Sequence, residues 1–382
     1  MQPAKRKLLI LTDWFDPAYK AGGPIRSAVN FIKQMKNDFE IFVLAGDRDL
    51  NEIRPLKGIT SNKWIEYVPG VKVFYASIQN LRLNNIKDYV SDIAPDIVYL
   101  NSMFSKKFTV YPLWLKRSNR ISAKIVLAPR GMLKTSALDF KRRKKRIFLS
   151  FLKWMKIPEL VTFHATDEQE RKDIINQFGK MVKVESISNF PGAQDDFLPP
   201  PKKEKGYLKI LFIGRIHPIK GLDFLLQVLK QVKQNISLTI VGNPEDISYR
   251  NLCKKIIADL PKNIQVSFSN EVPHHAINEL IRIHHVFCLP TKGENFGHAI
   301  FEALAAGRPV IISDQTPWRN LTRHNAGWDL SLTDPAKFRD AIEQCASMNQ
   351  DEFNEWCRGA WEFCKTYLES SDIKQKYLQL FN

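Results

Sequence analysis

Residues 294–302 read ENFGHAIFE and place two glutamates eight positions apart. Gly297 belongs to a predicted turn that leads into an apolar helix, which ends before Arg308 and Pro309. A helix N-terminus exposes backbone N–H groups and the positive end of the helix dipole, so it suits a phosphate group. We expect Glu294 to face a crevice before the helix and Glu302 to lie more than a turn inside it. Phosphate donors beside two hydroxyl-binding carboxylates favour a nucleotide sugar. The alternative is a surface helix that carries two glutamates, because Glu is common in helices.

A second stretch strengthens the first interpretation. Residues 212–222 read FIGRIHPIKGL. A strand is predicted to end at Ile213, followed by a turn that carries Gly214, Arg215 and Lys220. Two cations five residues apart around a turn can converge on a diphosphate, with arginine as a bidentate donor and lysine as a point charge.

A glycine loop follows the first predicted strand at residues 8–11. Residues 22–28 read GGPIRSA, and Pro24 suits the first position of a helix. Ligands bind at the carboxyl ends of strands in doubly wound sheets. We therefore expect Gly22 and Gly23 to let the backbone approach a donor diphosphate, and Asp13 in the preceding loop to contact an acceptor. A tight turn that needs glycine is the plain alternative.

These three motifs together resemble glycosyltransferase family 4 of the GT-B superfamily. That family carries a glycine loop after its first strand, then a strand followed by G-R-x4-K-G, then E-x-F-G with a second Glu eight positions after the first. The motifs occur here in that order, in both halves of the chain. The resemblance implies an α/β fold of two Rossmann-like doubly wound domains that face a central cleft.

The resemblance also implies a function: retaining transfer of a sugar from a nucleoside diphosphate sugar to a glycan or lipid-linked glycan acceptor, in envelope polysaccharide biosynthesis. Glu294, Arg215 and Lys220 would be the catalytic residues, without a metal or other cofactor. Glu294 would hold hydroxyls of the donor sugar and Glu302 those of the ribose. The expected donor-binding set comprises Gly22, Gly23, Gly214, Arg215, Lys220, Asn295, Phe296, Gly297 and Glu302.

Two further residues at strand ends are candidates for binding the acceptor. Arg130 lies in residues 128–133, which read APRGML, where many relatives have a His-Gly pair. An arginine there could bind an acceptor phosphate or simply lie at the surface. His164 closes another predicted strand, where a histidine is often satisfied within the fold. With Asp13, these residues form the expected acceptor side.

Residues 141–146 read KRRKKR and precede the apolar, aromatic residues 147–157. We expect Phe148, Phe151, Leu152 and Met155 to share one helical face. Basic residues beside apolar ones fit contact with an anionic membrane surface, and they equally fit an amphipathic helix packed on its own domain. Nucleic-acid binding is disfavoured, because no recognition motif accompanies the basic run.

The composition sets wider bounds on these interpretations. The chain has 382 residues and a formal net charge of +17, which favours an anionic partner such as a phosphorylated substrate. The five cysteines lack metal-like spacing, so we expect reduced thiols and a cytoplasmic location. The basic segment would add peripheral contact at the inner face of the membrane. No apolar run approaches the ~18 residues of a spanning helix.

Alternating strands and helices predict two parallel-sheet domains. We expect an acceptor-binding domain over 1–198, a linker over 199–206 where PPPKKEKG cannot form a core strand, and a nucleotide-sugar domain over 207–350. C-terminal helices over 351–382 should cross back to the first domain, as in the family. The alternatives are another GT-B enzyme, such as an epimerase or phosphorylase, and a non-catalytic protein that binds membranes or polyanions. The sugar, nucleobase and acceptor are left open.

Overall fold

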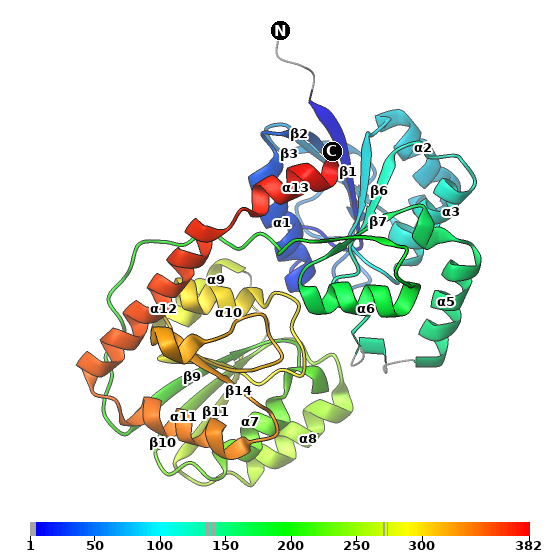
Figure 1. Ribbon diagram of the computed structural model, residues 1–382. Coiled ribbons are helices and arrows are strands. Elements are labelled where there is room, and N and C mark those ends of the chain that lie inside the picture. Colours follow the sequence, from blue (N-terminus) through cyan, green and yellow to red (C-terminus); the bar gives the residue numbers. More distant parts are fainter. Residues whose placement is uncertain (1–4, 135–136, 139–141, 270–271, 273) are drawn as a thin grey trace. The chain divides into compact units, whose positions relative to one another are not determined.

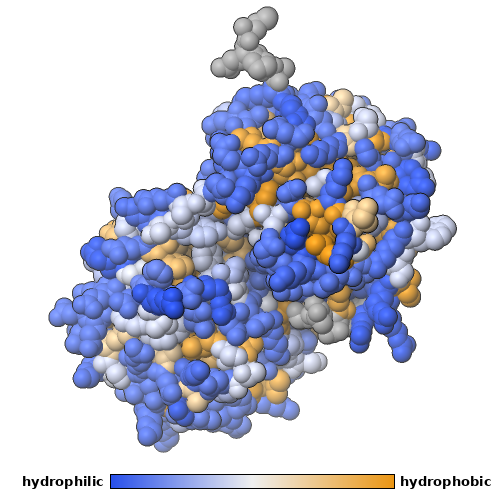
Figure 2. Space-filling view, viewed as in Figure 1, coloured by the Kyte–Doolittle hydropathy of each residue, from blue (hydrophilic) through white to orange (hydrophobic). Residues whose placement is uncertain are grey.

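The computed structural model describes residues 5–134, 137–138, 142–269, 272 and 274–382. The chain divides into two compact units, each an α/β sandwich around one sheet (Figure 1). Unit 1 comprises residues 1–190 and 372–382, and unit 2 comprises residues 191–371. Figure 2 shows that hydrophilic residues cover most of the visible face of each unit, with separate hydrophobic patches between them.

Unit 1 is built on an eight-stranded sheet with the order β3-β4-β2-β1-β5-β6-β7-β8. Neighbouring strands are parallel except for β3, which pairs antiparallel with β4 at one edge. The chain order reverses on either side of β1, as in doubly wound folds. The strands are β1 (Arg6–Thr12), β2 (Phe39–Gly46), β3 (Trp64–Val68), β4 (Val71–Ala76), β5 (Ile97–Leu100), β6 (Lys124–Leu127), β7 (Thr162–Ala165) and β8 (Lys183–Ser186).

Helices cover both faces of this sheet, so β1 is apolar along its whole centre. Leu8 and Ile10 enter one core cluster, whereas Leu9 and Leu11 enter the other, as the two-residue period of a strand requires. The helices are α1 (Gly23–Met35), η1 (Ile78–Asn80), α2 (Leu83–Ile93), η2 (Lys106–Val110), α3 (Tyr111–Arg117), α5 (Arg142–Trp154), η3 (Ile157–Glu159), α6 (Glu168–Phe178) and α13 (Ile373–Phe381).

Unit 2 is built on a six-stranded, fully parallel sheet with the order β11-β10-β9-β12-β13-β14. Its strands are β9 (Tyr207–Ile213), β10 (Asn235–Val241), β11 (Ile264–Ser269), β12 (Val286–Leu289), β13 (Val310–Ser313) and β14 (Gly327–Leu330). Its helices are η4 (Pro218–Lys220), α7 (Leu222–Leu229), α8 (Ile247–Ala258), α9 (His274–Ile283), α10 (His298–Ala305), η5 (Leu321–His324), α11 (Pro335–Ser347) and α12 (Gln350–Ser370). The order reverses beside β9, so the ends of β9 and β12 form its switch point.

The division between the units lies after Phe190, earlier than the proline-rich stretch 199–206. That stretch is attached to unit 2, because the buried Lys203 ammonium donates to the carbonyls of Ala346 and Met348 at the end of α11. These bonds satisfy carbonyls that a helix terminus leaves open. A run without strand propensity is therefore held by side-chain hydrogen bonds to unit 2.

The two C-terminal helices belong to different units. Helix α12 lies in unit 2, where the Trp356 ring stacks on Trp328 with centroids 4.1 Å apart. Helix α13 lies in unit 1, where Tyr377 and Phe381 contact the Phe31 ring of α1 at centroid distances of 5.2 Å and 5.8 Å. Only the last eleven residues, 372–382, therefore join the first unit.

Two local features were not predicted from the sequence, and one expectation needs correction. The edge strands β3 and β14 were not expected, because their half-buried residues do not form a continuous apolar run. Helix α6 begins after Asp167, whose side chain accepts from the Glu170 N–H, and the Thr166 hydroxyl donates to the Glu170 side chain. In α5, Phe151 and Leu152 do not share one face as expected, because Leu152 is buried whereas Phe151 is 44% exposed. Lys141 of the basic run lies outside the described residues.

Across the described residues, the chain has no helix with the length and hydrophobicity needed to span a membrane.

Candidate functional site

The loop after β9 is fixed by close backbone contacts in unit 2. Gly221 has a φ of 70°, and a Cβ added there would lie 2.0 Å from the Pro290 carbonyl oxygen, which follows β12. At Gly242, after β10, a Cβ would lie 2.0 Å from the Gly214 carbonyl oxygen. Glycine is therefore required where these three loops meet at the carboxyl edge of the sheet. This packing puts Lys220 beside the loop that carries Glu294.

Lys220 and Glu294 are in direct contact. The Lys220 ammonium donates to Glu294 Oε1, and the two side chains are only 17% and 13% exposed. The Glu294 N–H donates to the Gln315 carbonyl at 3.0 Å, which holds the loop after β12 against the segment after β13. Two residues that the sequence motifs assigned to a diphosphate and a sugar thus meet at one point.

Arg215 has a different partner. Its Nη1 lies 2.5 Å from Glu245 Oε2, and both side chains are partly exposed. Glu245 lies in the loop after β10, so this pair joins two loops at the carboxyl edge of the sheet. A guanidinium keeps other N–H donors when it binds one carboxylate, so Arg215 can still bind an anion.

The start of α10 is fixed by its neighbours in unit 2. Gly297 caps the helix with a φ of 77°, and Phe296 before it is buried, with its carbonyl accepting from the Trp318 indole N–H at 2.6 Å. Asn295 is half-buried and lies between Phe296 and Glu294. The turn is thus fixed by an aromatic anchor on one side and by the Glu294 loop on the other.

Glu302 lies on the second turn of α10 and is half-buried. It lines a small cavity of about 40 Å³ with Asn278 and Arg282 of α9 and with part of the segment 193–198. The structure therefore puts Lys220 and Glu294 in contact, whereas Glu302 lines a small hollow to which neither of them contributes.

In unit 1, the glycine loop is held by a buried carboxylate. Asp49, in the loop after β2, accepts from the Tyr19 N–H at 2.9 Å and from the Lys20 N–H at 3.2 Å. Gly22 then adopts a φ of 66° and caps α1, and both Gly22 and Gly23 are exposed. The loop is thus fixed by Asp49 and leaves its glycine backbone open.

Asp13, directly after β1, lines a larger pocket at the carboxyl edge of the unit 1 sheet. Its Oδ1 accepts from the Ser105 hydroxyl at 2.7 Å. Burial raises the pKa of the Asp13 carboxyl, while the Ser105 hydrogen bond and the Lys107 charge oppose that rise. The structure thus places Asp13 beside a ligand-sized space.

Arg130 is fixed by neutral partners at the end of β6. Its guanidinium donates to Asn101 Oδ1 at 2.6 Å and 3.1 Å, to the Tyr99 hydroxyl at 2.8 Å, and to Asn189 Oδ1. The side chain is half-buried. Most of its donors are therefore used inside unit 1, which favours a role in shaping the strand ends.

His164 does not have the geometry expected for an acceptor-binding residue. The side chain is fully buried, and its Nε2 lies 2.8 Å from the Ile187 carbonyl oxygen. A carbonyl only accepts, so Nε2 carries the proton and Nδ1 accepts from the Tyr99 hydroxyl at 2.7 Å. Burial lowers the pKa of His164 to about 3. Both nitrogens are used within the fold, so the expected role in acceptor binding is not supported.

Comparison with known proteins bears first on unit 2. Residues 194–357 match the family model described as "Glycosyl transferases group 1". Unit 2 carries a glycosyltransferase group 1 domain. This match includes the loops that hold Arg215, Lys220, Glu294 and Glu302.

Curated relatives resemble the same domain. The chain is 32% identical over 137 residues to the phosphatidyl-myo-inositol mannosyltransferase of Mycobacterium tuberculosis, covering 35% of each chain. It is 26% identical over 145 residues to the D-inositol 3-phosphate glycosyltransferase of Frankia alni, covering 35% of this chain and 36% of the relative. The matched part thus spans about a third of those relatives. An uncharacterized 41.2 kDa protein in the cps region of Klebsiella pneumoniae is 23% identical over 75% of this chain and 78% of its own.

Solved structures show the fold of the whole chain. The sucrose-phosphate synthase from Thermosynechococcus elongatus matches with a TM-score of 0.75 at 17% identity, covering 99% of this chain and 98% of that one. The Anabaena protein HepE, in complex with UDP and glucose, matches with a TM-score of 0.71 at 15% identity, covering 98% of each chain. The predicted fold class is therefore confirmed: two α/β units of the GT-B type.

Several residues that organise the glycosyltransferase group 1 domain were missed in the sequence. Thr291 is fully buried, and its hydroxyl lies 3.0 Å from the Ile219 carbonyl oxygen, which ties the loop after β12 to the turn before Lys220. The Ser313 hydroxyl donates to the Thr291 carbonyl at 2.5 Å. Glu245, the partner of Arg215, was also missed. A polar residue at the end of an apolar run, or one proline beyond it, was the available signal for Ser313 and Thr291, respectively.

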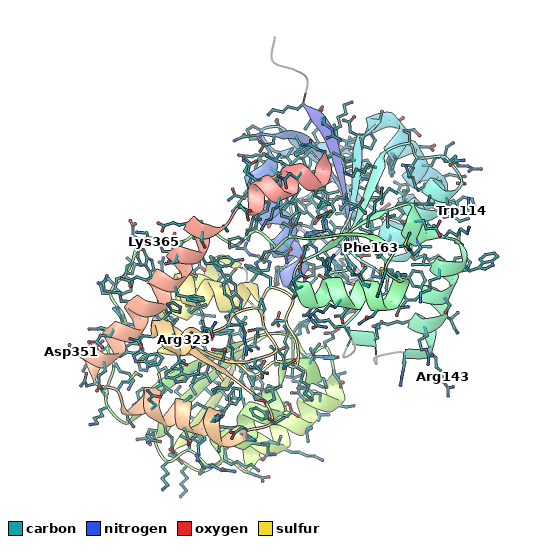
Figure 3. The ribbon with its side chains drawn as sticks, in the orientation of Figure 1. Trp114, Arg143, Phe163, Arg323, Asp351 and Lys365 are labelled. Atoms are coloured by element: carbon teal, nitrogen blue, oxygen red, sulfur yellow. The ribbon has the colours of Figure 1, made fainter. Side chains whose placement is uncertain are left out.

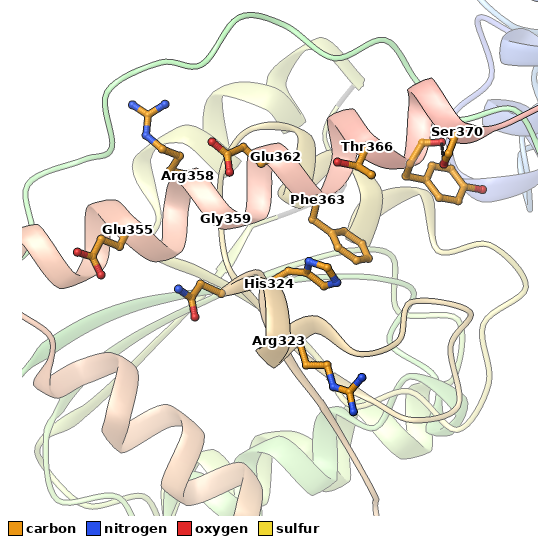
Figure 4. Close-up of a pocket in the computed structure, with 11 residues that line it drawn as sticks. Arg323, His324, Glu355, Arg358, Gly359, Glu362, Phe363, Thr366 and Ser370 are labelled. Atoms are coloured by element: carbon orange, nitrogen blue, oxygen red, sulfur yellow. Dashed lines mark hydrogen bonds between the residues drawn. The ribbon is translucent and has the colours of Figure 1, made fainter.

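The domain also has a hollow of about 590 Å³ that none of the predicted site residues lines (Figure 4). Glu355, Arg358 and Glu362 from α12 lie on one side, and Arg323 and His324 of η5 on the other. Gly359 lets the helix approach, since a Cβ there would lie 2.3 Å from the His324 carbonyl oxygen. Volume alone therefore does not identify the functional site.

Proposed function

We propose that the protein is a retaining glycosyltransferase that transfers a sugar from a nucleoside diphosphate sugar to a glycan or lipid-linked glycan acceptor. The observation that carries this proposal is the contact between Lys220 and Glu294 within a glycosyltransferase group 1 domain. A cation for a diphosphate and a carboxylate for sugar hydroxyls lie where the ligand of a doubly wound sheet binds.

The donor would bind across the carboxyl edge of the unit 2 sheet. Lys220 and Arg215 would bind the diphosphate together with the backbone amides near Phe296 and Gly297. Glu294 would accept hydrogen bonds from hydroxyls of the transferred sugar. Glu302, one turn further into α10, would accept those of the ribose. The HepE structure holds UDP and glucose, which supports a donor of this class.

The chemistry follows from the charge that develops on the leaving group. The bond between the sugar anomeric carbon and the diphosphate oxygen breaks, and a bond to the acceptor oxygen forms on the same face. The acceptor proton passes to the leaving phosphate oxygen, so no side chain need act as the base. Lys220 and Arg215 stabilise the negative charge on the diphosphate, an electrostatic role that requires no metal in this proposal.

The acceptor side would lie in unit 1, near Asp13 and the Gly22-Gly23 loop. Two of the relatives above are named as acting on inositol derivatives, and a third is described as a protein in the cps region. The phosphatidyl-myo-inositol of one name supports a lipid-linked acceptor for this chain, and we propose envelope polysaccharide biosynthesis as its context.

Helix α5 would bring unit 1 to an anionic membrane surface. It buries Leu149 and Leu152 but exposes Ile147 (72%), Phe151 (44%) and Trp154 (80%) along one stripe. Exposed cations flank that stripe, and Figure 3 shows the Arg143 side chain directed away from unit 1. Aromatic residues beside cations suit the interface of an anionic bilayer. The protein would therefore work in the cytoplasm, at the inner face of the membrane.

A ligand panel tests the proposed function. Differential scanning fluorimetry with UDP-, GDP- and ADP-sugars should identify one class that raises the unfolding temperature. A ligand at about 100 times its dissociation constant adds roughly 2.7 kcal/mol to the free energy of unfolding. That donor should then release nucleoside diphosphate in the presence of an acceptor, and less so in Lys220→Ala. Release of an epimerised sugar without any acceptor would favour an epimerase. Failure of all three classes to bind would refute the proposal.

A further inference from the structure

Unit 1 contains a pocket of about 430 Å³ at the carboxyl edge of its sheet, which we call the β1 pocket. Such a volume lies within the range of small-ligand sites. The pocket follows the strand ends on both sides of β1, where the strand order reverses. The residues used below are the carboxylates Asp13, Asp47, Asp49 and Glu52, the cations Arg48, Lys106 and Lys107, and the rings of Trp14 and Phe104.

Two of the four carboxylates hold loops of the protein itself. Asp49 accepts backbone N–H groups from Tyr19 and Leu50 at 2.9 Å and 2.8 Å, one on each oxygen. Glu52 accepts from the Lys20 ammonium at 2.7 Å. Asp49 therefore has a donor on each oxygen, and Glu52 is held in an ion pair at the edge of the pocket.

Asp47 has an oxygen that the protein leaves without a donor. The residue is only 2% exposed, and its Oδ2 accepts from the Ser61 hydroxyl at 3.1 Å. Its Oδ1 has no hydrogen-bond partner in the described part of the chain. Arg48 Nε lies 3.3 Å from that oxygen, within ion-pair distance but without hydrogen-bond geometry, and it too has no partner there. A buried acceptor without a donor is costly, so a ligand hydroxyl that reached the Asp47 carboxylate would be favoured.

Asp13 faces the same pocket with one of its oxygens bound to Ser105. Its carboxylate is more than half-buried, and burial raises its pKa. A hydroxyl donated to Asp13 would offset the cost of keeping the charged form in this position. Asp13 and Asp47 therefore both favour a ligand with hydrogen-bond donors.

The charges that line the β1 pocket favour a sugar over a phosphate as its ligand. With Lys20, which pairs with Glu52, four cations balance the four carboxylates around the β1 pocket, so a phosphate dianion would meet no excess of positive charge there. A sugar hydroxyl can donate to an aspartate and accept from a lysine or arginine at the same time. The half-buried rings of Trp14 and Phe104 supply apolar surface for the carbon face of a pyranose.

We propose that the β1 pocket binds an uncharged pyranose ring of the acceptor, with its hydroxyls donated to Asp47 and Asp13. The inference rests on the proposed transferase function and names the acceptor group that unit 1 recognises. Asp47 is a specificity-determining residue that the sequence did not single out. A lipid-linked phosphate would then lie outside this pocket.

Direct binding to the full chain tests the proposal. Saturation-transfer NMR with methyl glucoside, methyl galactoside and methyl mannoside should detect at least one of the three. Asp47→Asn and Asp13→Asn should each weaken that binding about 10-fold, as expected for a lost hydrogen bond to a charged group. Asp92→Asn, an exposed aspartate on α2, is the matched control and should leave binding unchanged.

Two additional measurements make each outcome decisive. Binding of UDP, GDP and ADP to the same variants reports on unit 2, so a failure of the donor proposal is seen separately from a failure of the β1 pocket. Unfolding temperatures show whether each variant is folded. If Asp47→Asn does not fold, Asp13→Asn provides the test of the pocket. Binding that persists in both aspartate variants overturns the proposal. Preference for glucose 6-phosphate or glucuronate over the neutral glycosides would overturn it too, and would identify a phosphate or carboxylate site, respectively.

Discussion

The Lys220 ammonium contacts the Glu294 carboxylate although the two residues are 74 positions apart in the sequence. The contact exists because the turn after β9 and the loop after β12 meet at the switch point of the unit 2 sheet. A donor diphosphate would compete with Glu294 for the same ammonium. Binding of the donor would then release Glu294 to accept hydroxyls of the sugar.

Lys220→Ala should lower turnover about 10²- to 10³-fold, because the loss of one donor to developing charge costs about 2.7–4 kcal/mol. Steady-state kinetics with the donor found in the ligand panel measures the effect. Lys233→Ala, an exposed lysine of the same unit, is the control and should retain wild-type rates. Wild-type turnover in Lys220→Ala would remove that lysine from the mechanism.

The two glutamates should differ in their effects. Glu302→Ala should weaken binding of the free nucleoside diphosphate, because its proposed partner is the ribose. Glu294→Ala should leave that binding nearly intact and reduce transfer. Titration calorimetry with the nucleoside diphosphate separates the two, and equal losses of affinity in both variants would contradict this division of roles.

Two glycines that flank the turn after β9 should differ in how much an alanine substitution lowers stability. Gly221→Ala should lower the free energy of unfolding by at least about 2 kcal/mol, because its Cβ would lie 2.0 Å from the Pro290 carbonyl oxygen at a positive φ. Gly214→Ala is the control, since the nearest atoms to its Cβ are Lys220 side-chain carbons at 3.5 Å. Urea unfolding followed by circular dichroism measures both. Similar stability of the two variants would mean that the Pro290 contact relaxes easily.

His164 should make the stability of unit 1 depend on pH. Its pKa of about 3 in the folded protein lies below the ordinary value of 6.5. Between these values the unfolded chain binds a proton that the folded protein does not, so stability falls as pH falls from about 6.5 toward 3. The slope is at most about 1.4 kcal/mol per pH unit from this group. Urea unfolding at pH 7, 6 and 5 should show a shallower slope in His164→Gln. An unchanged slope would mean that His164 titrates normally.

Helix α5 should bind anionic vesicles more strongly at low salt, because the Debye length falls from about 10 Å at 0.1 M to about 3 Å at 1 M. Sedimentation with phosphatidylglycerol vesicles should show loss of binding when Arg143, Lys144 and Arg146 are all changed to Ser. These cations are exposed, whereas the Lys145 ammonium donates to the Ala137 carbonyl at 2.6 Å and is left in place.

Changing Lys172 and Lys180 to Ser, on another part of unit 1, is the control for charge alone. A further variant with Ile147 and Trp154 changed to Ser tests the apolar stripe. Equal sedimentation of the wild type and the α5 charge variant would leave the helix as ordinary surface, and a soluble acceptor would then be favoured.

Much of the fold could be predicted because strand runs in both units are buried on two faces and read as continuous apolar segments. Strands β1, β5 and β12 are examples, and their residues are almost entirely buried. The edge strands β3 and β14 were missed because a half-buried strand lacks that signal. The place where the chain leaves unit 1 was also missed, since Lys203 is held by hydrogen bonds to α11 that no local pattern reports.

The sequence by itself determined the fold class and the residue types of the proposed donor site, because strand periodicity and the spacing of glycines, cations and carboxylates are local properties. Tertiary structure decided which groups meet. It paired Lys220 with Glu294 and Arg215 with Glu245, used both nitrogens of His164 inside the core, and left Asp47 with an oxygen that lacks a donor in the described part of the chain. These outcomes depend on parallel strands bringing distant loops to one edge of a sheet, and residue spacing along the chain does not specify those distances.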